Sequence, residues 1–211
     1  MRILTMLMAL MLGLLTVPGE ENSSLAKENG YVINLDRAEK LEKMTYSSLF
    51  SKAGIIVLED TDESLLGKVD KLEVCDNNLY VLEKGRGLFL FNKQGKFIKM
   101  IGRQGKGPGE YIDPDDISID RENKKIYVLD SQTQNVLKYS GNGTFESSFK
   151  LENKGTRSTF IQPFKNALYT NLYTFDKSGK RFLLSKVDVT NGKRISFQFE
   201  ASQYNKGWNE L

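Results

Sequence analysis

The stretches LYVLE at residues 79–83 and IYVLD at residues 126–130 decide the fold of this 211-residue chain. Both place one tyrosine among aliphatic residues and end on an acid, and Tyr127 follows Tyr80 by 47 positions. Short runs of β-branched and aromatic residues bounded by turn residues are typical of β-strands. We therefore predict that the two stretches are equivalent strands of a repeated unit.

Glycines recur at the same place in each unit. Gly143 follows Gly95 by 48 positions and Gly192 follows Gly143 by 49, each in a polar turn where a hairpin requires a positive φ. A weaker third unit contains Tyr169, which follows Tyr127 by 42 positions. A period of about 40–50 residues with several short strands per unit is the signature of β-propeller blades.

The repeat predicts an all-β fold, a β-propeller of four-stranded antiparallel blades over residues 31–211. The apolar runs are nearly continuous because neighbouring blades cover both faces of a middle strand, which then need not alternate. Residues 31–35 and 55–58 are also predicted to be strands, which either close a ring by pairing with a last blade or form an irregular first blade. Only residues 37–43 are predicted to be helical.

Residues 56–72, 79–83, 91–97 and 101–111 resemble the six-bladed β-propeller family of exported Gram-negative bacterial proteins, which are similar to the NHL-repeat propellers. The resemblance implies a six-bladed ring, export and often a lipid anchor. Residues 31–211 comprise 181 residues, enough for about four blades of roughly 45 residues. We therefore expect a partial propeller with about three to four of the six blades. A truncated gene, a fragment and a deviant family member are all open.

The first 19 residues are predicted to be a signal peptide. An apolar run, residues 3–17, follows Arg2 and precedes Glu20 and Glu21, and it is shorter than the roughly 20 residues that span a membrane. No cysteine lies near its end to carry a lipid anchor. Residues 20–30 are predicted to be a polar linker. We expect a periplasmic or secreted protein with no stable membrane span.

The composition excludes several kinds of chemistry. The chain has no histidine, which removes Ser-His-Asp and Cys-His catalysis and histidine-ligated metal sites. Its one cysteine, Cys75, is interpreted as a small buried apolar residue. The net charge of +3 comes from interspersed acids and bases, which does not favour nucleic acid as a partner. We predict no catalytic residue, no metal site and no cofactor.

The glycine-rich segment 102–110 is interpreted as the crossover between two blades. A nucleotide-binding P-loop is disfavoured because no Ser or Thr follows Lys106 and Pro108 comes next. A third reading places Arg103 and Lys106 at the border of a ligand groove on this face, where backbone N–H groups also bind anions. These two residues are the candidate ligand-binding residues.

Two acidic clusters are interpreted as turn chemistry. Asp113, Asp115 and Asp116 do not match the spacing of a calcium loop, and Asp and Pro before a strand are common in turns. The second cluster, which is likewise assigned to a solvated turn, comprises Glu59, Asp60, Asp62 and Glu63.

Two functions remain. The first is an exported, non-catalytic binding or scaffold protein whose ligand is a glycan, a peptide or a partner protein, bound through loops on one propeller face. The alternative is a hydrolase or lyase that depends on Ca²⁺ or Mg²⁺ held by oxygen ligands. An incomplete ring would also expose an apolar blade face at each end, so self-association through these ends is expected.

In a Gram-negative host, we expect the mature protein to start near Glu20 and to be soluble in the periplasm, because the apolar run ends in small residues at Val17 and Gly19. N-terminal sequencing of the purified protein checks the cleavage site. A soluble cytosolic product that begins at Met1 would contradict the signal-peptide assignment.

Overall fold

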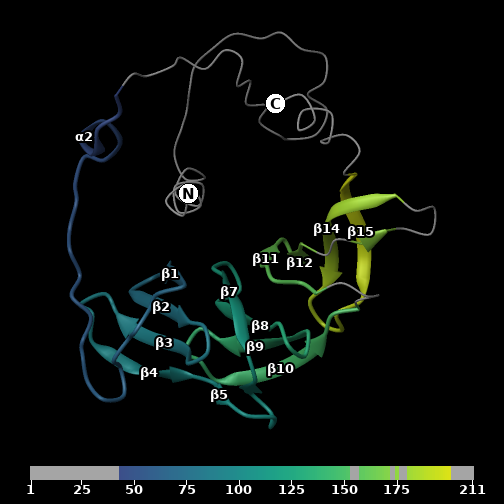
Figure 1. Ribbon diagram of the computed structural model, residues 1–211, viewed down its shortest axis with the longest axis horizontal. Coiled ribbons are helices and arrows are strands. Elements are labelled where there is room, and N and C mark those ends of the chain that lie inside the picture. Colours follow the sequence, from purple (N-terminus) through teal and green to yellow (C-terminus); the bar gives the residue numbers. More distant parts are fainter. Residues whose placement is uncertain (1–42, 153–156, 172–173, 176–179, 201–211) are drawn as a thin grey trace. The chain divides into compact units, whose positions relative to one another are not determined.

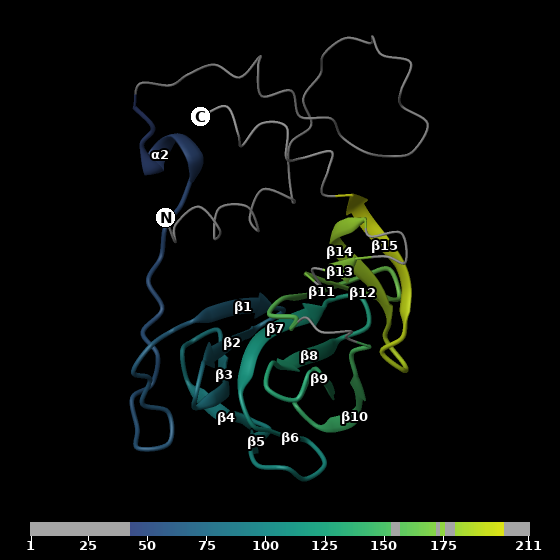
Figure 2. The same cartoon turned by 45° about the vertical axis from the view of Figure 1, so that its right-hand side comes forward.

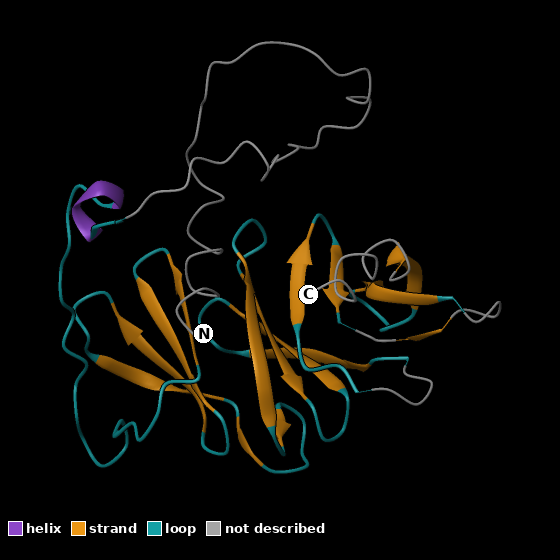
Figure 3. Cartoon of the chain, turned by 45° about the horizontal axis from the view of Figure 1, so that its top comes forward, coloured by secondary structure: helices purple, strands orange, loops and turns teal. Residues whose placement is uncertain are grey.

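The computed structural model describes residues 43–152, 157–171, 174–175 and 180–200, and they form almost only β-structure (Figures 1 and 3). A single helical turn, α2 (Tyr46–Leu49), is the one helix among them. The all-β prediction is therefore confirmed. The predicted signal peptide, the linker, the strand at 31–35 and residues 37–42 of the predicted helix lie outside the described residues. No helix within the described ranges is long and apolar enough to cross a membrane.

The chain divides into two units between Ala53 and Gly54, and every strand among the described residues belongs to the second unit. Two of its sheets contain four antiparallel strands paired in chain order. The first contains β1 (Lys71–Cys75), β2 (Asn78–Glu83), β3 (Gly87–Asn92) and β4 (Phe97–Ile101). The second contains β7 (Pro114–Asp120), β8 (Lys125–Asp130), β9 (Asn135–Ser140) and β10 (Phe145–Lys150).

A third sheet repeats this order with one addition. Its strands are β11 (Ile161–Phe164), β12 (Ala167–Thr170), β14 (Arg181–Asp188) and β15 (Arg194–Glu200), and the short β13 (Thr174–Phe175) also pairs with β14. Between the first two sheets, β5 (Arg103–Gln104) and β6 (Glu110–Tyr111) form a two-residue parallel pair.

The predicted repeat register is confirmed. Tyr80 lies opposite Glu73 of the strand before it, and Tyr127 lies opposite Ser118 in the same way, so both tyrosines occupy equivalent places in the second strand of their sheet. Each of the three hairpin glycines has a positive φ, namely 84° at Gly95, 77° at Gly143 and 73° at Gly192. Each hairpin precedes the last strand of its sheet, where the sequence places it.

Two hydrophobic cores lie where successive sheets pack on one another. The first core joins sheets one and two through residues such as Leu82, Ile117 and Ile126, and it includes Cys75, which is buried as predicted. The second core joins sheets two and three through Leu129, Leu168 and others. Adjacent residues of β8 therefore belong to different cores, which explains the continuous apolar run at 126–129. Fully burying one such side chain contributes about 1.5–3 kcal/mol.

The outer face of the first sheet is only partly covered. Leu58 and Leu66 pack against it, but Leu72 on β1 is 45% exposed. Its equivalent on β7, Ile117, is 0% exposed because the first sheet covers it. The predicted strand at 55–58 is wrong, since no strand is present there. A strand requires a paired neighbour, and none lies beside this segment in the described part of the chain.

The pair Ile117 and Leu72 offers a matched test of this packing. We expect Ile117→Ala to lower the free energy of unfolding by about 2–5 kcal/mol, since it leaves a cavity between two sheets. Leu72→Ala at the same register position is expected to cost about 1 kcal/mol, because its side chain is half exposed. Urea unfolding measures both values, and equal losses would contradict the stacking.

Candidate functional site

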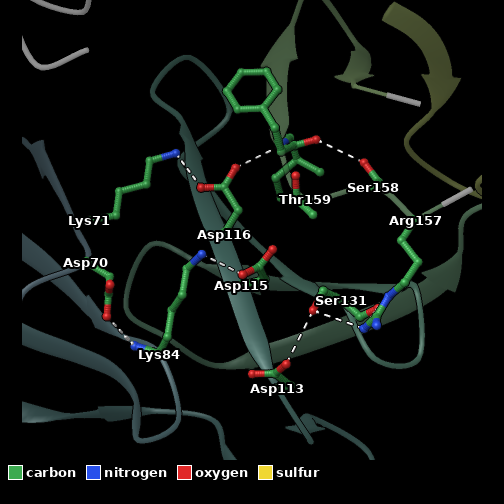
Figure 4. A network of polar contacts seen from close by, with 12 residues as sticks. Asp70, Lys71, Lys84, Asp113, Asp115, Asp116, Ser131, Arg157, Ser158 and Thr159 are labelled. Carbon is green, nitrogen blue, oxygen red and sulfur yellow. Dashed lines mark hydrogen bonds and ion pairs between the residues drawn. The ribbon is translucent and has the colours of Figure 1, made fainter. Parts of the chain in front are cut away.

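The first strands of the three sheets meet at one carboxylate, Asp116 (Figure 4). Strand β7 lies between β1 and β11 and contacts both (Figure 2). The Asp116 Oδ1 atom accepts a hydrogen bond from Lys71 Nζ on β1 at 2.7 Å, and its Oδ2 atom accepts one from the Ile161 N–H on β11 at 2.8 Å. Lys71 Nζ also lies 5.8 Å from the centre of the Phe160 ring. One buried carboxylate thus joins all three sheets.

Two further acids near the start of β7 continue this network. Asp115 forms an ion pair of 2.5 Å with Lys84, whose backbone N–H donates to Asp70 at 3.0 Å. The Asp113 carbonyl accepts the Ser131 N–H at 3.1 Å. Arg157 Nη2 then donates to the Ser131 carbonyl at 2.7 Å. These bonds fix the loops at the same end of all three sheets (Figure 4).

The turn assignment for the aspartates is partly wrong. Strand β7 begins at Pro114, so Asp115 and Asp116 lie within the strand. Each of the two carboxylates forms an ion pair with a different lysine. Burial raises the pKa of Asp116, and the Lys71 ammonium opposes that rise. Within the described ranges no group of three or more Cys, Asp and Glu side chains is placed to hold a metal ion.

The glycine-rich loop folds around Glu110. The Gly107 N–H donates to Glu110 Oε2 at 2.8 Å, and Arg103 Nε donates to Oε1 at 2.6 Å. A side chain at Gly105 would collide with this carboxylate, which explains the glycine there. The Gly107 N–H and then Arg103 lower the pKa of Glu110. The anion that this loop holds is therefore part of the chain itself.

Buried tyrosines anchor the loop to both flanking sheets. The Tyr111 hydroxyl accepts the Leu88 N–H at 3.1 Å and donates to the Ile101 carbonyl at 3.0 Å. The Tyr139 hydroxyl donates to the Gly109 carbonyl at 3.0 Å. Burial raises the pKa of both phenols, so they remain protonated donors. The loop connects the last strand of the first sheet to the first strand of the second, as the crossover interpretation requires, and these bonds hold it in place as one wall of a groove.

A groove of about 670 Å³ lies between this wall and strands β9 and β10. Its lining includes Lys106, Thr133, Asn135, Phe145, Ser147 and Ser148. Lys106 therefore borders the groove, whereas Arg103 does not line it and binds Glu110 instead. Ligand binding by Arg103 and Lys106 stays a prediction.

Sequence reasoning missed the polar residues on the sheet side of the groove. Ser147 and Ser148 are exposed on β10, and Asn135 begins β9. Within the described part of the chain, none of these three side chains has a hydrogen-bond partner. Two adjacent serines in a predicted outer strand were the available signal.

Comparisons with known proteins place these features in context. A family model described as "Domain of unknown function (DUF4934)" matches residues 30–210. No curated protein matches the sequence. A solved structure from Bacteroides fragilis, described as a "Putative exported protein", is 25% identical with a TM-score of 0.60.

That match covers 69% of this chain and 41% of the other, so this chain spans less than half the length of the protein it resembles. A member of the duf4221 family from Bacteroides vulgatus is 9% identical with a TM-score of 0.48, over 69% of this chain and 48% of the other.

We expect Glu110→Gln to loosen the glycine-rich loop, because the neutral amide loses the charge-assisted bonds to Gly107 and Arg103. Amide hydrogen exchange measured by NMR should show several-fold weaker protection at Gly107. In the unmodified protein the same protection should be full above the ordinary pKa of 4.5 and be lost as the pH falls through the lowered pKa of Glu110.

The matched control is Glu63→Gln, which changes an exposed glutamate outside this loop. It should leave exchange at Gly107 unchanged. Full protection of Gly107 in Glu110→Gln at every pH would show that the carboxylate does not organise the loop.

Proposed function

The chain belongs to the family described as a domain of unknown function, DUF4934. We propose that it is an exported, non-catalytic binding protein built as part of a β-propeller. Its ligand site is the groove beside the glycine-rich loop. The observation that carries this proposal is a groove beside a tethered loop, in which the two carboxylates of the lining, Glu110 and Asp130, already have partners within the chain.

The propeller assignment is supported by the repetition of one sheet design. Consecutive antiparallel strands form each sheet, equivalent hairpins carry Gly95, Gly143 and Gly192, and two cores lie between successive sheets. In a propeller, blades stack in this manner around a common axis. The first strands β1, β7 and β11 would then be the innermost strands of three blades.

Export is supported by the apolar segment at residues 3–17 and by the description of the structural relative as an exported protein. Residues 1–19 would be removed as a signal peptide, residues 20–30 would form a linker, and residues 31–211 would form the blades. The mature protein would then act in the periplasm or outside the cell.

The chemistry of the groove favours an uncharged, hydroxyl-rich ligand such as a glycan. Glu110 accepts from Gly107 and Arg103, and Asp130 accepts the backbone N–H groups of Ile112 and Thr133, so neither carboxylate needs a ligand. The groups that remain are neutral hydroxyls and an amide from Ser147, Ser148 and Asn135, with Phe145 as an apolar surface and Lys106 at the rim. Pockets with an apolar surface and a few placed polar groups are typical of small-ligand sites.

A panel of neutral oligosaccharides tests this proposal, followed by titration calorimetry on each binder. The double variant Asn135→Ala/Ser148→Ala should weaken binding at least about tenfold, which corresponds to about 1.4 kcal/mol. Both residues lie at exposed or half-exposed strand positions, so the fold should be retained.

The control, Ser51→Ala/Asn77→Ala, removes the same groups at exposed positions outside the groove and should bind as the unmodified protein does. The glycan assignment fails if no oligosaccharide binds, or if the groove variant binds as tightly as the control.

A further inference from the structure

The segment Ile56–Glu59 occupies the place that the end of a last strand occupies elsewhere in the fold. At the third sheet, the Lys150 carbonyl lies against Gly192, and the Glu152 N–H donates to the Gly192 carbonyl at 3.3 Å. At the first sheet, the Val57 carbonyl lies against Gly95 in the same way, and the Glu59 N–H donates to the Gly95 carbonyl at 2.7 Å.

The apolar contacts agree with this equivalence. Leu151 follows Lys150 and is buried in the second core, and Leu58 follows Val57 and packs against the outer face of the first sheet. The chain therefore begins its first sheet with a strand terminus already docked on the hairpin.

The end of β10 and the segment at residues 54–58 differ on the side that faces away from the hairpin. Phe149 and Lys150 pair with β9, whereas no strand pairs with residues 54–58 in the described part of the chain. Ile55 is 94% exposed and Val57 is 78% exposed. An exposed apolar edge of this kind is a template for adding another strand.

The geometry fixes which backbone groups are free. The Val57 carbonyl and the Glu59 N–H both face the Gly95 hairpin, and groups two residues apart on one side are the alternation of an extended strand. In an extended strand over this segment, the polar groups of Gly54, Ile56 and Leu58 would face away from that hairpin. An antiparallel partner strand would bond to these three residues.

The charged residues before and after this apolar run have opposite signs, so the segment is complementary in charge to an antiparallel copy of itself. Lys52 precedes it, and Glu59 and Asp60 follow it. Glu59 already accepts the Phe97 N–H at 2.9 Å, while Asp60 is exposed. If two copies pair antiparallel about Ile56, Lys52 of each copy lies opposite Asp60 of the other, and Ile55 lies opposite Val57.

We propose that Gly54–Leu58 is a self-pairing edge through which two copies of this chain form a symmetric antiparallel β-ladder. The proposal is independent of the ligand groove. It commits to a second copy because the segment is self-complementary in charge and in apolar character, as a two-fold interface requires. Main-chain bonds would supply affinity, and the flanking ion pairs would set the register.

Charge reversal tests the register directly. Sedimentation equilibrium of the mature protein should show a dimer, and Lys52→Glu or Asp60→Lys alone should raise the dimer dissociation constant at least about tenfold, because each creates two like-charge pairs. An equimolar mixture of the two variants should recover the original dissociation constant, since the heterodimer regains both opposite-charge pairs.

A second variant separates this edge from other surfaces. Val57→Lys would place a charge opposite Ile55 of the partner and should abolish the dimer. Ile195→Lys, which changes a 55% exposed residue on β15, should not. A monomer from the unmodified chain, a dimer unaffected by the reversals, or reversed variants that fail to recover on mixing would each overturn the proposal.

Discussion

The buried carboxylate of Asp116 is the contact on which the arrangement of the three sheets depends. Its two oxygens bind Lys71 on β1 and the Ile161 N–H on β11, so one side chain of the middle sheet fixes the first strand of each neighbour. Burying a charge is costly unless it is paired and hydrogen-bonded, and here both oxygens have partners. Because β7 is held on both sides, the loops that precede it are held as well.

The candidate site follows from that constraint. The chain reaches β7 through the glycine-rich loop, which Tyr111 and Tyr139 bind to the sheets on either side. The internal carboxylate of Glu110 fills the loop, so its backbone donors are directed inward. The loop therefore lines the groove, and the groups available to a ligand come from β9 and β10.

The repeat could be read from the sequence because stacking imposes it. Tyr80 and Tyr127 occupy equivalent strands, and the hairpin glycines need their positive φ in every unit. The pairing of strands could not be predicted in this way. Residues 55–58 have the composition of a strand, but no strand in the described part of the chain pairs with them. Nor could the groove, since Lys106 and Ser148 line the same groove only when the loop folds onto the next sheet. Asp116 looks like a turn residue in the sequence, and its role depends on partners 45 positions away in each direction.

Native-state hydrogen exchange of an Asp116→Ala variant tests the central role of this carboxylate most directly. The first sheet would retain its Tyr111 and Tyr139 tethers, while the third sheet would lose its bond at Ile161. Amides of β12 should therefore lose far more protection than those of β2. No loss in either strand would show that Asp116 does not join the sheets, and equal loss in both would contradict the tethering of the first sheet by Tyr111 and Tyr139.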